Sequence, residues 1–397
     1  MQHITSDILY IGSSEGHTPL FENIYPVPNG MSYNAYLIDD EQTVLTDTCD
    51  VRVRDAFWDN LTTALAGRTL DYLLVHHVEP DHAALVAEVV DRYPTVRVVC
   101  TAKARDMLAQ FTGRDFSDRT QTIREGDTLT TGRHTFAFYT APMVHWPEVM
   151  VSYDTTDKVL FSADAFGTFG ELNGDIFADT RSLDGDWLDE ARRYYANIVG
   201  KYGVQVQALL KKAAGLDIQV ICPLHGPIWR QDLAYLLDKY NRWSTYTPES
   251  NGVVMFYGSI YGHTERFVRD LAADLAERDI TDVRLYDVVK THPSVAVAEA
   301  FRCRNLVVAA VSYNAGLFPP METVLADLRA HGLRQRNLAL IQNGSWAPSA
   351  GRVMTDMLTG LNDITYYEPM ITLKSAPTPD QTAERHVLAD WLALQAQ

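Results

Sequence analysis

The chain has few cysteines, and none of them is close to another. Its four cysteines, Cys49, Cys100, Cys222 and Cys303, stand singly among 397 residues. Without a Cys-x-x-Cys pair they predict neither a disulfide framework nor an iron–sulfur or rubredoxin site. Cys222 lies close to His225, but the segment ICPLHG predicts a buried strand, where a free cysteine is usually a small apolar residue. We therefore expect these cysteines to be structural.

Long apolar runs and positive charge are also scarce. No segment has the length of uninterrupted apolar sequence that a transmembrane helix needs, and the N-terminus lacks a signal pattern. A formal net charge of −17 argues against nucleic acid or an anionic membrane as the main partner, because both repel an acidic surface. With 46% hydrophobic and 21% charged residues the composition is that of a soluble globular protein. We expect a cytoplasmic protein.

The length of the chain and a polar stretch near its middle predict two domains. A chain of 397 residues is too long for one ordinary core, and TYTPESNG, residues 245–252, separates two regions of different rhythm. Residues 1–248 mix short strands with irregularly spaced helices, which predicts two packed sheets with helices outside, an αββα sandwich. Residues 252–397 alternate five strand-like segments with helices, which predicts a doubly wound, five-stranded parallel sheet of flavodoxin type.

The most informative feature is a cluster of potential metal ligands in the first region. His77, Glu79, Asp81 and His82 form His-x-Glu-x-Asp-His directly after the apolar run LDYLLVHH. Residues two apart in an extended segment project to the same side, so the first three can converge, whereas His76 points to the other side and is interpreted as structural. Charged side chains beside a buried strand are costly unless they are paired or bound to metal. Three more candidates follow at expected strand ends: His145, Asp164 and His225.

The types of donor atom indicate which metal is bound. Hard oxygen donors mixed with imidazole, without thiolate, suit iron or manganese at least as well as zinc. Two ferrous ions bring four positive charges, of which three carboxylates cancel three. A bridging hydroxide would make the cluster neutral, which favours its burial.

This ligand pattern resembles that of the flavodiiron proteins, whose N-terminal half has a metallo-β-lactamase-like fold. Hydrolases of that fold typically have His-x-His-x-Asp-His, and here Glu79 stands where their second histidine would be. The resemblance implies which residues bind each iron: His77, Glu79 and His145 the iron nearer the flavin, Asp81, His82 and His225 the farther one, with Asp164 between them as a bridge. Of these positions, the one matching His82 is not a ligand in every family member.

Three loops in the second region are expected to bind FMN. The first offers hydroxyls and main-chain N–H groups at the start of a helix, which would cradle a phosphate. It resembles the flavodoxin loop Ser/Thr-x-Thr-Gly-x-Thr, with Tyr261 in place of the middle threonine, although a helix cap and turn would explain this loop alone equally well. Aromatic residues in the other two would give planar walls to an isoalloxazine ring, and Trp346 and Tyr313 are the candidates for flanking it. The three loops consist of Ser259, Ile260, Tyr261, Gly262, His263 and Thr264; of Ser312, Tyr313, Asn314, Ala315 and Gly316; and of Asn343, Gly344, Ser345, Trp346 and Ala347.

The two halves together predict a redox enzyme. Zinc has no redox chemistry and would gain nothing evident from a fused flavin domain. Two ferrous ions and FMNH₂ hold the four electrons that reduce O₂ to water, and two molecules of NO need two electrons to become N₂O and water. The resemblance implies one or both activities, and the sequence does not rank them. Tyr25 and Trp146 are candidate pocket residues, although each also fits a plain role in the core.

The resemblance also implies partners. Family members form head-to-tail homodimers, alone or as dimers of dimers, in which the flavin of one subunit faces the iron centre of the other. Because the chain ends near Gln397, after the flavodoxin-like helix, we expect a separate electron donor, either rubredoxin or a reduced deazaflavin. Two alternatives stay open at this point: a metallohydrolase with an added flavodoxin domain, and an electron-transfer module whose metal domain is degenerate.

Overall fold

The chain forms two compact units, each of which is described by itself. The computed structural model describes residues 2–17 and 19–396. One unit comprises Met1–Tyr195 and Tyr202–Asn241, and the other comprises Ala196–Lys201 and Arg242–Gln397. The short segment Ala196–Lys201 thus joins the second unit although the residues on both sides of it belong to the first.

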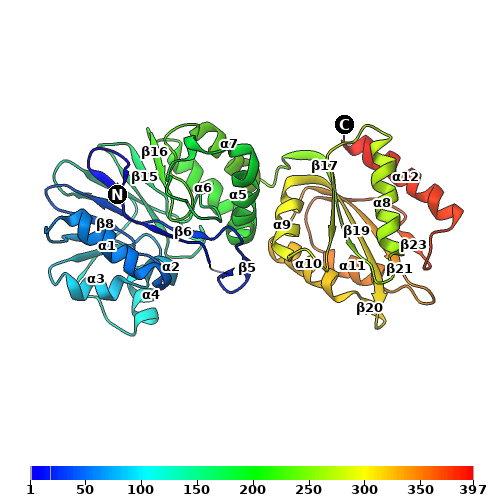
Figure 1. Cartoon of the computed structure of the whole chain (residues 1–397), viewed down its shortest axis with the longest axis horizontal. Helices are drawn as coiled ribbons and strands as arrows, with labels where there is room; N and C mark the ends of the chain where they lie inside the picture. The colour runs from blue at the N-terminus through cyan, green and yellow to red at the C-terminus, as the bar shows by residue number, and fades with distance from the viewer. Residues whose placement is uncertain (1, 18, 397) are drawn as a thin grey trace. The chain divides into compact units, whose positions relative to one another are not determined.

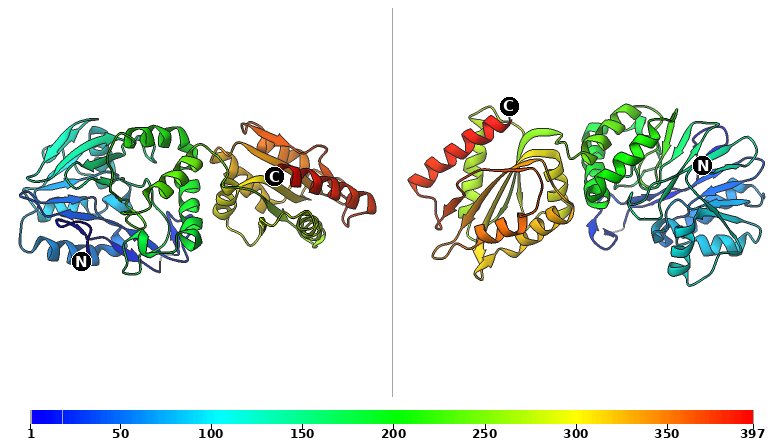
Figure 2. Two further views of the ribbon diagram at one scale, coloured as in Figure 1. Left: turned by 90° about the horizontal axis from the view of Figure 1, so that it is seen from above. Right: turned by 180° about the vertical axis from the view of Figure 1, so that it is seen from behind.

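The first unit contains two main sheets, which Figure 1 shows in blue to green. Helices α1 to α4 gather beside the first sheet and α5 to α7 beside the second (Figures 1 and 2). In sheet order, the first consists of β1 (Gln2–His3), β2 (Ile8–Tyr10), β7 (Tyr36–Ile38), β8 (Val44–Thr46), β9 (Tyr72–Leu74), β10 (Arg97–Thr101) and β11 (Thr120–Ile123), and the second of β12 (Thr128–Thr130), β13 (Thr135–Thr140), β14 (Met150–Asp154), β15 (Val159–Phe161) and β16 (Val220–Cys222). The helices are α1 (Arg54–Leu65), α2 (Pro80–Ala83), α3 (Val86–Arg92), α4 (Ala102–Thr112), α5 (Leu188–Tyr194), α6 (Gly203–Ala213) and α7 (Leu233–Ser244). Two short antiparallel pairs also belong to this unit: β3 (Ser13–Glu15) with β6 (Met31–Tyr33), and β4 (Leu20–Phe21) with β5 (Tyr25–Pro26).

The core of the first unit lies between the inner faces of its two sheets. Ile38 and Leu74 from the first sheet share one buried cluster with Phe136, Phe138 and Phe161 from the second. In β13, Phe136 and Phe138 are buried while the residues next to them are only partly so, as expected for a strand that turns one face to the core. The predicted αββα sandwich is confirmed.

The second unit is a parallel sheet covered by helices on both faces (Figures 1 and 2). Helices α8 (His263–Ala276) and α12 (Pro379–Ala396) pack together on one face, while α9 (Pro293–Arg302), α10 (Pro319–Ala330) and α11 (Ala350–Leu358) cover the other. The strand order is β18 (Val283–Asp287), β17 (Ser250–Gly258), β19 (Cys303–Tyr313), β21 (Arg336–Asn343), and then β22 (Ile364–Tyr366) with β23 (Ile371–Leu373). A two-residue strand, β20 (Gly316–Leu317), pairs antiparallel with the end of β19.

This order is 2-1-3-4-5 in chain numbering, which is the flavodoxin-like order and confirms the predicted fold. The last of the five strand-like segments predicted from the sequence, ITYYEPMIT at residues 364–372, is not a single strand. The structure divides it into β22 and β23, which pair with successive parts of β21. Pro369 lies between them, and because proline has no N–H to donate it interrupts the ladder there.

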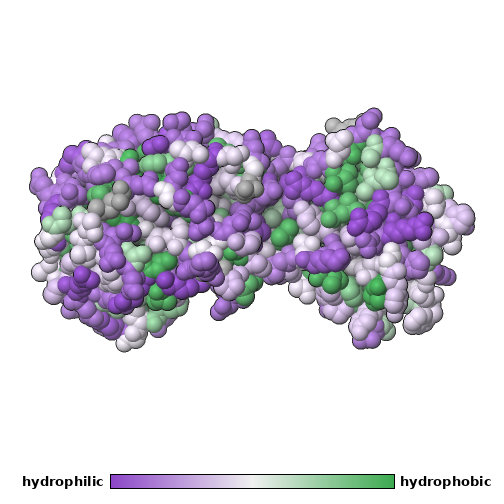
Figure 3. All heavy atoms as spheres, viewed as in Figure 1, coloured by the Kyte–Doolittle hydropathy of each residue, from purple (hydrophilic) through white to green (hydrophobic). Residues whose placement is uncertain are grey.

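Polar residues dominate the face of each unit that Figure 3 draws. On the face drawn in Figure 3, apolar residues occur in small patches among polar ones. Among the residues that the structure describes, no helix combines the length and the apolar character needed to cross a bilayer.

Candidate functional site

Seven candidate ligands of the first unit lie in loops or helix ends that follow its central strands. β9 ends at Leu74, and the chain then passes His77 and reaches Glu79, the residue just before α2. Pro80 occupies the first turn of this helix, where its missing N–H costs nothing. Asp81 and His82 lie on α2 itself. The remaining three lie in the loops after β13, β15 and β16: His145, Asp164 and His225.

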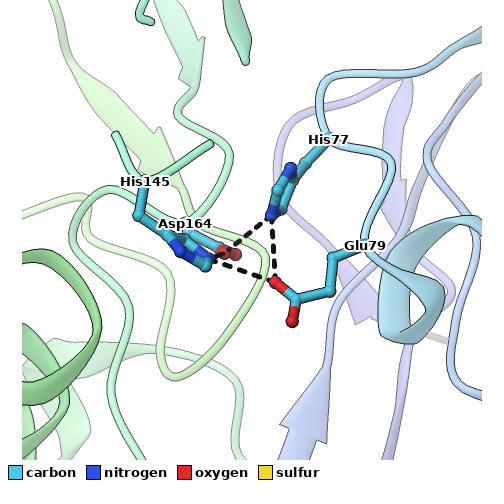
Figure 4. Close-up of side chains that lie close together, drawn as sticks. All are labelled: His77, Glu79, His145 and Asp164. Atoms are coloured by element: carbon cyan, nitrogen blue, oxygen red, sulfur yellow. Dashed lines mark hydrogen bonds and ion pairs between the residues drawn. The ribbon is translucent and has the colours of Figure 1, made fainter. Parts of the chain in front are cut away.

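Four of these side chains converge on one point. His77, Glu79, His145 and Asp164 each offer a ligand atom within 4.8 Å of the others. The Nε2 atoms of His77 and His145 lie 3.2 and 3.1 Å from the same Glu79 oxygen, and 3.4 and 3.0 Å from Asp164 Oδ2 (Figure 4). The imidazoles and carboxylates thus point inward from separate segments, as ligands of one ion do.

The other three candidates, Asp81, His82 and His225, form a second cluster. It lies beside the first cluster, which consists of His77, Glu79, His145 and Asp164. His82 and His225 direct their Nε2 atoms toward each other at 3.0 Å, and each lies 3.2 to 3.3 Å from Asp81 Oδ2. Asp164 connects the two points, because its Oδ2 faces the first cluster while its Oδ1 lies 3.1 Å from His82 Nε2 and 3.7 Å from that of His225. A carboxylate with one oxygen on each side has the arrangement of a bridging ligand.

The electrostatics of the site favour cations. Both carboxylate oxygens of Asp81, and Oδ1 of Asp164, are buried without a hydrogen-bond donor among the described residues. Burial opposes ionisation of Asp164, yet His82 and His77 outweigh it and hold the pKa of its carboxyl well below the usual range. Burial likewise opposes protonation of His145, but its hydrogen bonds to Asp164 and Glu79 raise its pKa to about 9. Buried charges of this kind are costly unless a metal or a proton neutralises them.

The outer nitrogens of the imidazoles have different partners. Nδ1 of His77 lies 2.7 Å from Oε1 of Glu148, which is fully buried. Nδ1 of His225 lies 2.6 Å from the carbonyl oxygen of Ser32. Nδ1 of His82 is buried with no hydrogen-bond partner among the described residues. Sequence reasoning missed Glu148, and its position three residues after His145 was the only available signal.

Aromatic rings pack around the second cluster. The ring of Tyr194 lies 5.6 Å from that of His225 and 5.2 Å from that of Phe169, measured between centroids. The candidate pocket residue Tyr25 is half-buried and packs on Phe169, with 5.9 Å between the rings. Tyr194 is fully buried, and its hydroxyl has no hydrogen-bond partner among the described residues. Sequence reasoning missed Tyr194, since nothing in its local sequence marks it.

The other candidate pocket residue, Trp146, packs on the first cluster. Its ring meets that of His77 edge to face at 5.2 Å and stacks on Phe111 at 5.9 Å. His76 turns away from the site: its Nδ1 lies 2.6 Å from Asp47 and its Nε2 lies 2.7 Å from Ser152, all three of them buried.

In the second unit, the three loops predicted from the sequence meet at one cavity. It has a volume of about 460 Å³, within the usual range for a small-molecule site. It lies beyond the carboxyl ends of the strands, at the point between β17 and β19 where the strand order reverses. Among the predicted residues, Gly262 and Gly316 do not line it; Val311 and Ser375, which were not predicted, do. Ser375 comes from a fourth loop, after β23, and its N–H donates to Asn343.

The first loop has the geometry of an anion cradle. Gly262 has φ 86° and precedes α8 without a side-chain cap, so the first N–H groups of this helix are not satisfied by a capping side chain. The hydroxyl of Ser259 accepts the N–H of Gly262, which fixes the turn. Two aromatic rings stand at the rim of the cavity, where Tyr261 is 90% and Trp346 is 92% exposed.

Comparison with known sequences agrees with this architecture. Residues 31–226 match the family model described as ODP family beta lactamase. The anaerobic nitric oxide reductase flavorubredoxin of Aeromonas hydrophila is 29% identical over 391 residues, which is 96% of this chain and 76% of that protein. An uncharacterised protein of Methanocaldococcus jannaschii is 31% identical over 307 residues, which is 76% of this chain and 75% of that protein.

Two solved structures superpose on almost the whole length of this chain. Rubredoxin oxygen:oxidoreductase of Desulfovibrio gigas superposes with a TM-score of 0.91 and 26% identity, over 99% of this chain and 98% of that one. The flavodiiron protein of Giardia intestinalis, at 23% identity, has the same fold with a TM-score of 0.93, over 100% and 96% of the two chains. This chain belongs to the flavodiiron protein family. The resemblance noted in the ligand motif is therefore confirmed at the level of the family.

Proposed function

We propose that the protein reduces O₂ to water, NO to N₂O, or both, at a non-haem di-iron centre supplied with electrons through FMN. The observation that carries this proposal is the position of Asp164, which presents one oxygen to each of two converging sets of ligands. The relatives named above as a nitric oxide reductase and as a rubredoxin oxygen:oxidoreductase support the two reactions.

The proposed ligands fit a pair of iron ions. His77, Glu79 and His145 would hold one, Asp81, His82 and His225 the other, and Asp164 would bridge them. Imidazole and carboxylate donors without thiolate suit iron, and the buried oxygens of Asp81 and Asp164 that lack hydrogen-bond donors would be satisfied by it. When bound, two ferrous ions would supply two electrons and sites at which small gas molecules bind.

Side chains of this chain would exclude water from the irons and donate a hydrogen bond or a proton to the substrate. The rings of Phe169, Tyr194 and Tyr25 would keep bulk water from the second cluster, and Trp146 would do the same beside His77. Burial and the Asp164 carboxylate hold the pKa of the Tyr194 hydroxyl well above its usual value. This hydroxyl therefore stays protonated and is a candidate donor of a hydrogen bond or a proton to bound substrate.

The second unit would hold FMN as an electron relay. The uncapped start of α8 and the hydroxyls of Ser259 and Thr264 would receive the phosphate. Tyr313 and Trp346 would flank the isoalloxazine ring in a cavity of suitable size.

Electrons would come from a separate donor, and assembly would complete the path. We propose rubredoxin or a reduced deazaflavin as the donor, which the name of the Desulfovibrio gigas relative supports for rubredoxin. We further propose a head-to-tail homodimer, alone or as a dimer of dimers, in which the FMN of one subunit serves the irons of its partner.

Anaerobic stopped-flow measurements test the function. Protein prepared without oxygen is assayed for iron and FMN, reduced, and mixed separately with O₂ and with NO while flavin absorbance is followed. We expect two irons and one FMN per chain, and rapid oxidation of the flavin by at least one of the gases. Stoichiometric zinc together with esterase or lactonase activity would instead support a hydrolase of the same fold.

A further inference from the structure

Glu148 is a buried carboxylate that no substrate or metal is expected to touch. Its side chain is fully buried, and its Oε1 lies 2.7 Å from His77 Nδ1, the imidazole nitrogen that points away from the cluster. The same oxygen accepts the main-chain N–H of Val78 at 3.1 Å. A carboxylate oxygen accepts at this contact from the tautomer of His77 that carries its proton on Nδ1, and that tautomer leaves Nε2, which faces the cluster, able to bind a metal.

The backbone holds Glu148 firmly in this position. Its carbonyl oxygen accepts the hydroxyl of Thr101 at 3.1 Å, and β14 begins two residues later at Met150. Its second oxygen, Oε2, is buried without a donor among the described residues. A buried carboxylate with so few donors retains most of its electrostatic effect on its neighbour, because little else screens the charge.

The two clusters therefore differ in how their imidazoles are supported. Nδ1 of His225 in the second cluster contacts a neutral carbonyl, that of Ser32, and Nδ1 of His82 has no partner among the described residues. Among the described residues, neither histidine has a carboxylate at its Nδ1 like the one at Nδ1 of His77. A negative charge hydrogen-bonded to a ligating imidazole makes it a stronger donor and favours the more highly charged state of the metal.

We infer that Glu148 is a positioning residue that fixes the orientation of His77 and lowers the reduction potential of the iron in the first cluster relative to that in the second. This inference rests on the proposed di-iron function. By resemblance the first cluster is the one nearer the flavin. Glu148 would therefore make the iron that first accepts electrons from FMN the weaker oxidant of the two and direct electrons onward to the second iron.

Three variants separate charge from packing. Glu148→Gln keeps the size of the side chain and an oxygen acceptor but removes the charge, whereas Glu148→Asp keeps the charge. Asp154→Asn is the matched control, because Asp154 is a buried carboxylate of the same unit whose Oδ2 lies 2.8 Å from Nδ1 of another buried histidine, His134. All variants are studied as full-length protein containing FMN, after iron and flavin are quantified.

The decisive readout is a potentiometric titration of the two irons, followed by Mössbauer and electron paramagnetic resonance spectroscopy. In Glu148→Gln, the Fe(III)/Fe(II) equilibrium of one iron should shift about tenfold toward Fe(II), equivalent to about 59 mV for one electron, while the other iron changes little. Glu148→Asp should stay close to the unmodified protein, and Asp154→Asn should not move either potential.

Each outcome bears on the inference. Unchanged potentials in an iron-replete Glu148→Gln protein would overturn it. If that variant does not retain iron, Glu148→Asp decides: retention of both irons with near-native potentials supports a role of the charge, and equal loss of iron contradicts it. Unmodified protein that contains no iron would refute the proposed function itself, a result that is distinct from either of these.

Discussion

Replacing Tyr194 by phenylalanine should slow turnover without lowering the stability of the protein. The Tyr194 side chain is fully buried, and its hydroxyl has no hydrogen-bond partner among the described residues. An unpaired buried hydroxyl costs about 1–3 kcal/mol, so Tyr194→Phe should leave the free energy of unfolding of the metal-free protein unchanged or raise it by about 1 kcal/mol. Its ring packing on Phe169 and His225 is retained in the variant.

The same hydroxyl is expected to matter during turnover. Burial and Asp164 raise its pKa well above the usual value, so it remains a donor at neutral pH next to the second cluster. Loss of a positioned proton donor typically slows a reaction about 100-fold, and we expect this order of loss in the oxidation of the reduced protein by its preferred gas. Iron and FMN contents should not change.

A second tyrosine variant provides the control. The hydroxyl of Tyr153 donates to the carbonyl oxygen of Asp217 at 2.8 Å, away from the ligand clusters. Tyr153→Phe should therefore lower stability by about 1 kcal/mol and leave turnover intact. Urea unfolding and anaerobic stopped-flow spectroscopy measure both quantities. If Tyr194→Phe oxidises at the native rate with both gases, the role assigned to this hydroxyl is wrong.

Three further predictions concern other parts of the chain. Burial opposes protonation of His134, but its hydrogen bonds to the carboxylates of Asp154 and Asp7 outweigh burial and raise its pKa above the unfolded value near 6.5. The stabilisation from these bonds is therefore full below that pH and fades as pH rises through the folded value. Asp154→Asn should thus destabilise the protein more at pH 6 than at pH 9 in urea titrations, and an equal loss at both would refute this. A Cβ at Gly258 would lie 2.6 Å from a ring carbon of Phe318, so Gly258→Ala should weaken FMN binding at least about tenfold in fluorescence titrations, and native affinity would show that the cavity tolerates the shift. Mixing His145→Ala with a variant unable to bind FMN should restore about a quarter of the native activity if electrons cross between subunits, whereas no recovery would favour transfer within one chain.

The sequence predicted the architecture because its signals there are local. Alternation of apolar strands with helices after residue 252 is enough to indicate a parallel sheet, and the structure has this sheet in the order 2-1-3-4-5. The break at Pro369 was not predicted, since the apolar pattern continues across it. The assignment of Ala196–Lys201 to the second unit was also beyond prediction, because it depends on contacts distant in sequence, such as that of Asn197 with Ser294.

In the candidate site, too, residues with a local signal were predicted, whereas residues that act through contacts distant in sequence were not. His77, Glu79 and Asp81 could be grouped from their spacing alone. His145, Asp164 and His225 were candidates because they follow expected strand ends, and the family resemblance implied which iron each would bind. Glu148 and Tyr194 could not be identified, because their importance comes from side-chain contacts across many residues of sequence: one lies behind His77 and the other beside His225.

The most direct test of the account is Mössbauer spectroscopy of the oxidised protein enriched in ⁵⁷Fe. A bridge at Asp164 predicts two irons per chain in one coupled pair, with spectra that show no net magnetism at low temperature, and loss of this coupling in Asp164→Ala. Two uncoupled irons, a single iron, or a spectrum that Asp164→Ala leaves unchanged would contradict the central claim.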